Sequence, residues 1–199
     1  MQVRKRILDE AAKQFLSYGI RNITMDDIAV SLGISKRTVY EKFKNKTELV
    51  FYCLQELTKH QLIASKAIIN KSPNVIDSIS CLMQEGIKML NSINPVFFSD
   101  LKKFYPEIAE TVYNENVKTR EEFTYQLLRR GIDEGIFRED INIKIVAKLF
   151  HEQINVISDE KMFPPEEYNF SEVYRNLVIN FMRGISTSKG ISIIEETII

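Results

Sequence analysis

Side chains that can donate hydrogen bonds to nucleic acid are concentrated in one short stretch of the chain. Between positions 35 and 46 they include Ser35, Lys36, Arg37, Thr38, Tyr40, Lys42, Lys44 and Lys46. Long cationic side chains can donate to the acceptor atoms of guanine in the major groove, and ammonium or hydroxyl groups can donate to phosphate oxygens. The chemistry of this stretch therefore suits contact with double-stranded DNA.

Two short helices joined by a glycine turn are expected to position these side chains. Thr24, followed three residues later by Asp27, has the spacing of a capping box at a helix start. Gly33 suits the left-handed turn that ends this helix, and Ser35 can cap the next one. Apolar residues recur at helical spacing in both segments. The pattern predicts a helix-turn-helix, whose second helix enters the major groove with its N-terminal residues at the base edges.

This geometry assigns different contacts to different side chains. Lys36 and Arg37 lie in the first turn of the second helix, where they can reach bases or flanking phosphates, and Thr38 can serve either surface. Phosphate contacts are expected from Tyr40, Lys42, Lys44 and Lys46. The free amides at the helix start at Thr24 attract a phosphate, an attraction that the neighbouring Asp26 weakens.

The charge distribution separates a basic N-terminal part from an acidic remainder. Residues 1–50 contain ten basic and six acidic side chains, a net charge of +4, whereas residues 51–199 carry −4, and the whole chain carries 0. Lysines scattered over a helix usually form a solvated face, which is the alternative interpretation of this stretch. The asymmetry between the two parts favours a nucleic-acid-facing end attached to a neutral or acidic body.

Residues 2–50 resemble the DNA-binding domain of the TetR family of bacterial transcriptional repressors. The resemblance rests on RILDEAAKQFLSYGIRNITMDDIAVSLGISKRTVYEKFKNKTELV at 6–50, with its glycine near position 19 and its closing tyrosine, aromatic and lysine pattern. It implies DNA contacts from Thr24, Ser35, Lys36, Arg37, Thr38, Tyr40, Lys44 and Lys46. The chain departs from the family at Lys36 and Arg37, where small residues are common, and at Lys42, where a ring is common.

The remainder of the chain shows helical periodicity and no convincing alternating strand. Helices are expected from Lys46 to about Asn70 and over about 75–91, 97–104, 107–134, 142–158 and 168–186. The sequence thus predicts an all-α fold, with a three-helix helix-turn-helix DNA-binding domain at 1–46 and a helical domain at 47–199, to which the resemblance assigns ligand binding and dimerisation. The apolar tail at 191–199 can pack or pair, but the pattern assigns it no partner.

Dimerisation is expected because one helix-turn-helix contacts only a few base pairs. The last two long helices carry apolar stripes, Ile143, Val146, Ala147, Phe150, Ile154 and Ile157 in one and Val173, Leu177, Val178, Phe181 and Ile185 in the other. The resemblance implies that these helices pair with their symmetry mates in a four-helix interface. A role confined to the core of one protomer is the alternative.

The resemblance also implies a repressor, which is the prevailing mode in the family, acting on a palindromic operator. The body is then expected to hold a small-molecule inducer whose binding favours a conformation that fits the operator poorly. Aromatic and methionine side chains in the body are interpreted as ordinary core, so no ligand-contacting residue is named. A helical adaptor that keeps the family fold but binds another protein is the alternative function.

Enzymes, metal proteins and membrane proteins receive little support from the residues. Only His60 and His151 are present, and HEQIN at 151–155 lacks the second histidine of the zinc-protease motif. Cys53 and Cys81 are too few for a structural zinc site or a disulfide framework, and no cofactor motif is found. The chain has no stretch of about 18 apolar residues and no secretory signal in its charged start, so a cytoplasmic protein is expected.

Overall fold

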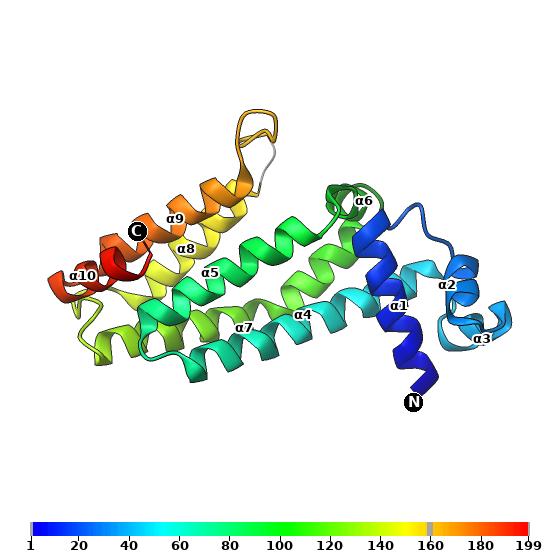
Figure 1. The fold of residues 1–199 in the computed structure, drawn as a ribbon, viewed down its shortest axis with the longest axis horizontal. Helices are drawn as coiled ribbons and strands as arrows, with labels where there is room; N and C mark the ends of the chain where they lie inside the picture. The colour runs from blue at the N-terminus through cyan, green and yellow to red at the C-terminus, as the bar shows by residue number, and fades with distance from the viewer. Residues whose placement is uncertain (1, 159–160, 199) are drawn as a thin grey trace. The chain divides into compact units, whose positions relative to one another are not determined.

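The computed structural model describes residues 2–158 and 161–198. Within them every regular element is an α-helix, apart from an isolated antiparallel bridge between Phe137 and Ser186. The helices are α1 (Gln2–Tyr18), α2 (Met25–Leu32), α3 (Lys36–Lys42), α4 (Lys46–Lys71), α5 (Val75–Ser92), α6 (Pro95–Phe104), α7 (Pro106–Asp133), α8 (Ile143–Ile157), α9 (Phe170–Ile185) and α10 (Ser188–Thr197) (Figure 1). The predicted all-α fold, an N-terminal helix-turn-helix followed by a helical body, is confirmed.

The helix boundaries follow local capping signals that the sequence carries. Asn142 and Asn169 cap α8 and α9, and each side chain accepts a hydrogen bond from a backbone amide three residues later. The helix expected from 97 begins two residues earlier, because Asn94 caps it and Pro95 occupies the first helical position, where a missing N–H costs nothing.

The C-terminal tail forms a helix that the apolar pattern did not assign. Thr187 caps α10 by accepting from the amide of Gly190 at 3.2 Å, and its hydroxyl donates to the carbonyl of Gly135 at 3.0 Å. Ile194 is fully buried in the core formed with α5, α7, α8 and α9. Residues up to 198 of the tail at 191–199 are therefore part of the body, while Ile199 lies outside the described residues.

The chain forms two compact units. The first joins residues up to Ala64 with Met89–Asn116, and the second joins Ser65–Lys88 with the residues from Val117 onward. Helices α4, α5 and α7 each contribute residues to both units. The expected division at residue 46 concerns function and remains a prediction, whereas the packing places α6 in the same unit as the helix-turn-helix.

Helix α6 completes the core of the first unit. Phe97 is buried in the same cluster as residues of α1 to α4, which includes Ile7, Phe15, Ile28, Val39 and Leu49. The amide of Asn94 donates to the carbonyl of Leu16 at 2.8 Å, and its side chain donates to that of Ser17 at 3.0 Å. These bonds satisfy carbonyls at the end of α1 that no helical amide can reach.

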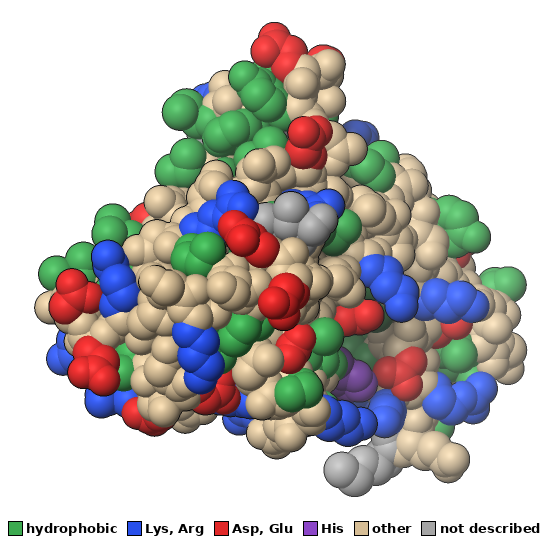
Figure 2. Space-filling model, turned by 60° about the vertical axis from the view of Figure 1, so that its left-hand side comes forward, with side chains coloured by type: hydrophobic (Ala, Val, Ile, Leu, Met, Phe, Trp, Pro, Cys, Tyr) green, Lys and Arg blue, Asp and Glu red, His purple; other side chains and the backbone are tan. Residues whose placement is uncertain are grey.

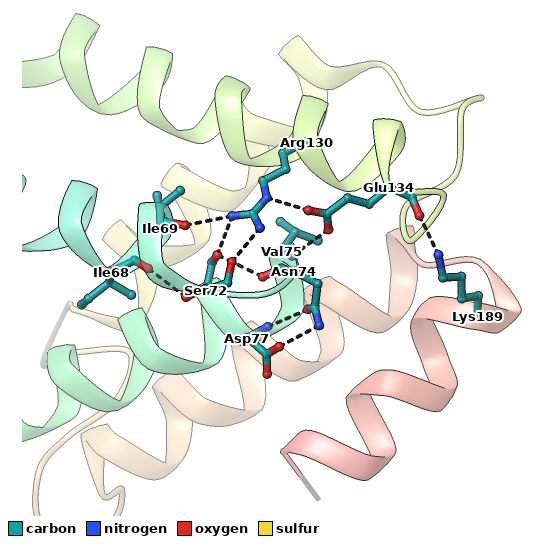
Figure 3. Close-up of polar contacts among 10 residues, drawn as sticks. Ile68, Ile69, Ser72, Asn74, Val75, Asp77, Arg130, Glu134 and Lys189 are labelled. Carbon is teal, nitrogen blue, oxygen red and sulfur yellow. Dashed lines mark hydrogen bonds and ion pairs between the residues drawn. The ribbon is translucent and has the colours of Figure 1, made fainter.

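In the second unit, one arginine fixes the turn between α4 and α5 (Figure 3). The guanidinium of Arg130, on α7, donates to the carbonyls of Ile69 and Ser72, both at 2.9 Å. It also pairs with Glu134 at 2.6 Å, whose other oxygen accepts from the amide of Val75 at 2.8 Å. Arg130 and Glu134 thereby satisfy one carbonyl in the last turn of α4, one carbonyl in the turn that follows it and the first amide of α5.

No helix among the described residues combines the length and the apolar character needed to cross a bilayer. The same residues contain no group of three or more His, Cys, Asp or Glu side chains arranged to hold a metal ion.

Two glycines with left-handed backbones allow backbone strain and crowding to be separated. A Cβ at Gly19 (φ 83°) would lie 2.6 Å from Cγ1 of Val96, whereas one at Gly33 (φ 63°) would meet nothing within 4 Å. We expect Gly33→Ala to lower the free energy of unfolding by about 1–2 kcal/mol through strain alone. Gly19→Ala should lose roughly 1–3 kcal/mol more because α6 must shift. Chemical denaturation measures both, and equal losses would contradict close packing of α6 on α1.

Candidate nucleic-acid interface

The helix-turn-helix is held by reciprocal capping bonds at its first helix. The Thr24 hydroxyl accepts from the amide of Asp27 at 3.1 Å, and the Asp27 carboxylate accepts from the amide of Thr24 at 2.8 Å. Hydrogen bonds from the Thr24 side chain and backbone hold the pKa of Asp27 below its usual value. The predicted capping box is present, and Thr24 is exposed at the start of α2.

The second helix begins directly after the turn. Gly33 adopts the left-handed conformation, and its amide donates back to α2, which ends the first helix. Ser35 caps α3, since its hydroxyl accepts from the amide of Thr38 at 3.1 Å and lies 2.8 Å from the Thr38 hydroxyl. The hydroxyls of Ser35 and Thr38 are thus already engaged in the helix start when the protein is free of DNA.

Helix α3 buries one face and exposes the face that carries the predicted contacts. Val39 is fully buried, and Thr38 is half-buried. Lys36, Arg37 and Tyr40 are exposed, and the Arg37 side chain reaches 89% exposure. The expected placement of the two cations in the first turn of an outward-facing helix agrees with the structure, although their contacts with bases remain a prediction.

Each of these two cations is paired with a carboxylate. The ammonium of Lys36 lies 2.7 Å from the carboxylate of Asp26 on α2, and the guanidinium of Arg37 lies 3.0 Å from that of Glu41 on α3. The hydrogen bond and charge of Asp26 raise the pKa of Lys36, with a smaller contribution from Tyr40. The Arg37–Glu41 pair has the i,i+4 spacing that a sequence can reveal, whereas the Asp26–Lys36 pair joins two helices and was not predicted.

Two of the lysines expected to contact phosphate differ from Lys36 and Arg37 in having no carboxylate partner. Lys42 and Lys44 are exposed, and in the described part of the chain no carboxylate lies within 4.0 Å of either ammonium. The backbone amide of Lys44 donates to the Glu48 carboxylate at 2.6 Å, and Asn45 accepts from the amide of Glu48 at 2.8 Å. The start of α4 is therefore fixed, while both ammonium groups remain available to a phosphate.

Lys46 is half-buried and already has a partner. Its ammonium donates to the carbonyl of Arg21 at 3.3 Å, in the segment between α1 and α2. Burial lowers the pKa of Lys46, against the opposing effect of the carboxylates of Asp100 and Asp27. The amide of Arg21 in turn donates to Asp100 of α6 at 2.7 Å. Lys46 thus joins α4 to the segment before α2, besides its predicted contact with phosphate.

Two arginines of the first unit lie over aromatic rings, and the sequence pattern predicted neither contact. The guanidinium of Arg4 lies 4.9 Å from the ring centre of Phe43 and 4.3 Å from that of Tyr52. That of Arg21 lies 5.2 Å from the ring of Phe104. These contacts bring side chains from distant positions together, so local spacing gives no signal for them.

Residues 7–53, from α1 into α4, match the family model described as bacterial regulatory proteins, tetR family. The N-terminal segment of the chain belongs to the TetR family of bacterial regulators. The family includes transcriptional regulators with a helix-turn-helix, so the predicted class of protein is confirmed.

Relatives and solved structures extend the similarity beyond the matched segment. The transcriptional repressor KstR2 of Mycobacterium tuberculosis is 22% identical over 152 residues, which cover 75% of this chain and 76% of the relative. A transcriptional regulator from Saccharomonospora viridis in complex with choline has a TM-score of 0.72 at 18% identity, covering 94% of this chain and 98% of that one. FadR from Bacillus subtilis in complex with stearoyl-CoA has a TM-score of 0.66 at 16% identity, covering 91% and 98%. These two structures show a shared fold.

Alanine variants should separate base contacts from phosphate contacts. We expect Lys36→Ala or Arg37→Ala to weaken binding to the preferred sequence by about 1–3 kcal/mol and to relax specificity at one position. Lys44→Ala and Lys46→Ala should weaken binding to all sequences and reduce the salt dependence by about one unit. Of these two, only Lys46→Ala should also lower the melting temperature, because only Lys46 bonds to the Arg21 carbonyl.

Binding isotherms on preferred and scrambled DNA at several salt concentrations, with thermal melts of each variant, provide the measurements. Equal losses of affinity on every sequence would mean that Lys36 and Arg37 contact phosphates and not bases.

Proposed function

We propose that the protein is a homodimeric transcriptional repressor that binds a palindromic operator and is released from it by a small-molecule ligand. The observation that carries the proposal is the capped helix-turn-helix, which presents Lys36 and Arg37 on the exposed first turn of α3. In this proposal residues 1–46 bind DNA, and residues 47–199 bind the ligand and form the dimer. The protein acts by binding, without catalysis, in the cytoplasm where the bacterial chromosome lies.

Contact with the operator follows from the positions of the side chains. In the proposed complex Lys36 and Arg37, on the N-terminal turn of α3, face base edges, where guanine offers two acceptors in the major groove. Thr24, Tyr40 and Lys44 contact phosphates in the same proposal, which fixes the register of α3 in the groove. Ser35 and Thr38 contribute their hydroxyls at the helix start, and Lys46 contacts phosphate from the start of α4.

Dimerisation is supported by an apolar face that the second unit leaves exposed. Ile145, Leu149 and Val156 of α8 are 57%, 56% and 47% exposed at helical spacing. Hydrophobic side chains also gather at the top of the view in Figure 2. In the segment between α8 and α9, Met162 and Tyr168 are exposed. A contiguous apolar face of this kind typically marks an interaction surface.

The exposed face differs from the stripes that the sequence suggested. Ala147 and Ile157 of the α8 stripe are buried in the protomer, and so are Val178 and Ile185 of the α9 stripe. Phe150 packs on Phe181, with ring centres 4.6 Å apart. The stripe residues therefore serve largely as core, and the proposed interface uses the neighbouring face of α8.

A ligand-binding role is supported by neighbours of the same fold. The regulator from Saccharomonospora viridis binds choline and FadR from Bacillus subtilis binds stearoyl-CoA, two ligands of very different size and charge. The fold therefore supports ligand binding in general and not one ligand class. Helices α4, α5 and α7 contribute residues to both compact units, so a ligand-induced shift of these helices in the second unit is transmitted along continuous helices.

Selection from a random DNA library, followed by fluorescence-anisotropy titration, tests the DNA-binding part of the proposal. We expect a palindromic sequence bound roughly a thousandfold or more tighter than scrambled DNA at the same salt concentration. Weak binding that is equal on all sequences would refute a sequence-specific regulator and favour the protein-binding adaptor.

Leu149→Glu tests the dimer in the same experiment, and Ile63→Glu is its matched control. The charge on the exposed α8 face should give a monomer in sedimentation and weaken binding to the full palindrome far more than to one half-site, while circular dichroism shows that the monomer keeps its helical content. Ile63→Glu, a change on α4 at a side chain that is 59% exposed, should leave the assembly unchanged. A wild-type monomer at micromolar concentration would contradict the proposed dimer.

Release by a ligand is tested with compounds that raise the melting temperature. A compound that favours the conformation unfit for DNA should weaken operator binding at fixed salt, and a tenfold loss corresponds to about 1.4 kcal/mol of coupling. Compounds without a thermal effect serve as controls. If stabilising compounds leave operator affinity unchanged, the protein binds ligands without being released by them.

A further inference from the structure

The basic side chains of the helix-turn-helix fall into two groups by their partners. The two cations on the first turn of α3 each have a carboxylate, Asp26 for Lys36 and Glu41 for Arg37. The exposed lysines at positions 42 and 44 have none within 4.0 Å in the described part of the chain. The carboxylates thus accompany the cations placed toward bases and not those placed toward phosphates.

The fold does not account for Asp26. The capping box of α2 uses Asp27, whereas the carboxylate of Asp26 bonds to Lys36 of the next helix. Its pair with Lys36 is exposed, with side chains 52% and 60% accessible, and exposed ion pairs contribute little to stability. Any helix-dipole benefit of an acidic residue in the first turn is available from Asp27 as well. Because stability does not explain Asp26, we look for its effect in DNA binding.

We infer that Asp26 and Glu41 are positioning residues that suppress binding to DNA lacking the operator sequence. They hold Lys36 and Arg37 away from phosphates until base acceptors replace them. The inference rests on the proposed function, since it assigns a source of specificity to the same DNA-binding helix.

The physical argument compares the two kinds of DNA. Binding to any sequence is driven by neutralising phosphates with cations. A cation that leaves its carboxylate for a phosphate leaves that carboxylate unpaired beside a polyanion, so little is gained. On the operator, the guanine acceptors of the major groove accept from the cation in a fixed geometry, which compensates for the lost pair. The carboxylates therefore weaken binding to unrelated DNA more than they weaken binding to the operator.

The test uses the isosteric variants Asp26→Asn and Glu41→Gln in the full-length protein. Glu85→Gln is the control: Glu85 pairs with Lys88 on α5, is 60% exposed, and loses the same charge outside the helix-turn-helix. Each protein is titrated with its selected operator and with scrambled DNA at several salt concentrations, and thermal melts establish that each variant is folded.

For Asp26→Asn we expect affinity for scrambled DNA to rise about tenfold and affinity for the operator to rise less than about threefold, so that the specificity ratio falls. The freed Lys36 should steepen the salt dependence on scrambled DNA by about one unit for each protomer, which a purely structural role would not do. Glu41→Gln should act in the same direction through Arg37, and Glu85→Gln should change neither ratio nor slope.

Other outcomes would overturn the inference. An equal rise on both DNAs, with an unchanged ratio, would mean that the carboxylates act only through net charge. A loss on the operator alone would mean that a carboxylate accepts directly from a base, as it can from the amino group of cytosine. A wild-type protein with no sequence preference would overturn the proposed function, and this inference with it.

Discussion

The arrangement of the DNA-binding helices depends on how the backbone of one residue, Arg21, is held on both its amide and its carbonyl. Its amide donates to the buried carboxylate of Asp100 on α6 at 2.7 Å, and its carbonyl accepts from the ammonium of Lys46 on α4 at 3.3 Å. Asp100 is only 6% exposed, so loss of the Arg21 amide as a donor would leave a buried carboxylate oxygen unsatisfied, at a cost of about 1–3 kcal/mol. The segment between α1 and α2, and with it the approach of α2 and α3, is thus fixed from two sides by helices that follow later in the chain.

This constraint explains why the helix-turn-helix and α6 form one compact unit. The side chain of Asn94 donates to a carbonyl at the end of α1, and Val96 packs closely against Gly19. Phe97 completes the core. Residues 1–46 carry the side chains proposed to contact DNA but lack these groups. Because Lys46 takes part in the same network as Asp100, a displacement of α6 would change the surroundings of a predicted phosphate contact as well as the packing of α1.

Local features were predictable from the sequence and long-range ones were not. The capping box at Thr24, the turn at Gly33 and the cap at Ser35 depend on residues within three or four positions, so their spacing is a direct signal. The bond from Arg21 to Asp100 spans 79 positions, and nothing in the pattern of α6 marks one aspartate as buried. Helix α10 was missed for a related reason, because the cap of Thr187 is anchored by carbonyls at 135 and 136.

Charge acts on two length scales in this protein. The net charge of +4 over residues 1–50 attracts DNA of any sequence from a distance, an effect that salt screens within about 8–10 Å. Within the first turn of α3, by contrast, the pairs with Asp26 and Glu41 satisfy the cations at contact distance. Long-range attraction therefore brings the protein to DNA, and the exchange of a carboxylate for a base acceptor is a short-range event. A side chain that has a partner in the free protein contributes to affinity only the difference in free energy between its interaction with DNA and its interaction with that partner. This difference depends on which bases the side chain meets, so the contribution is sensitive to the DNA sequence.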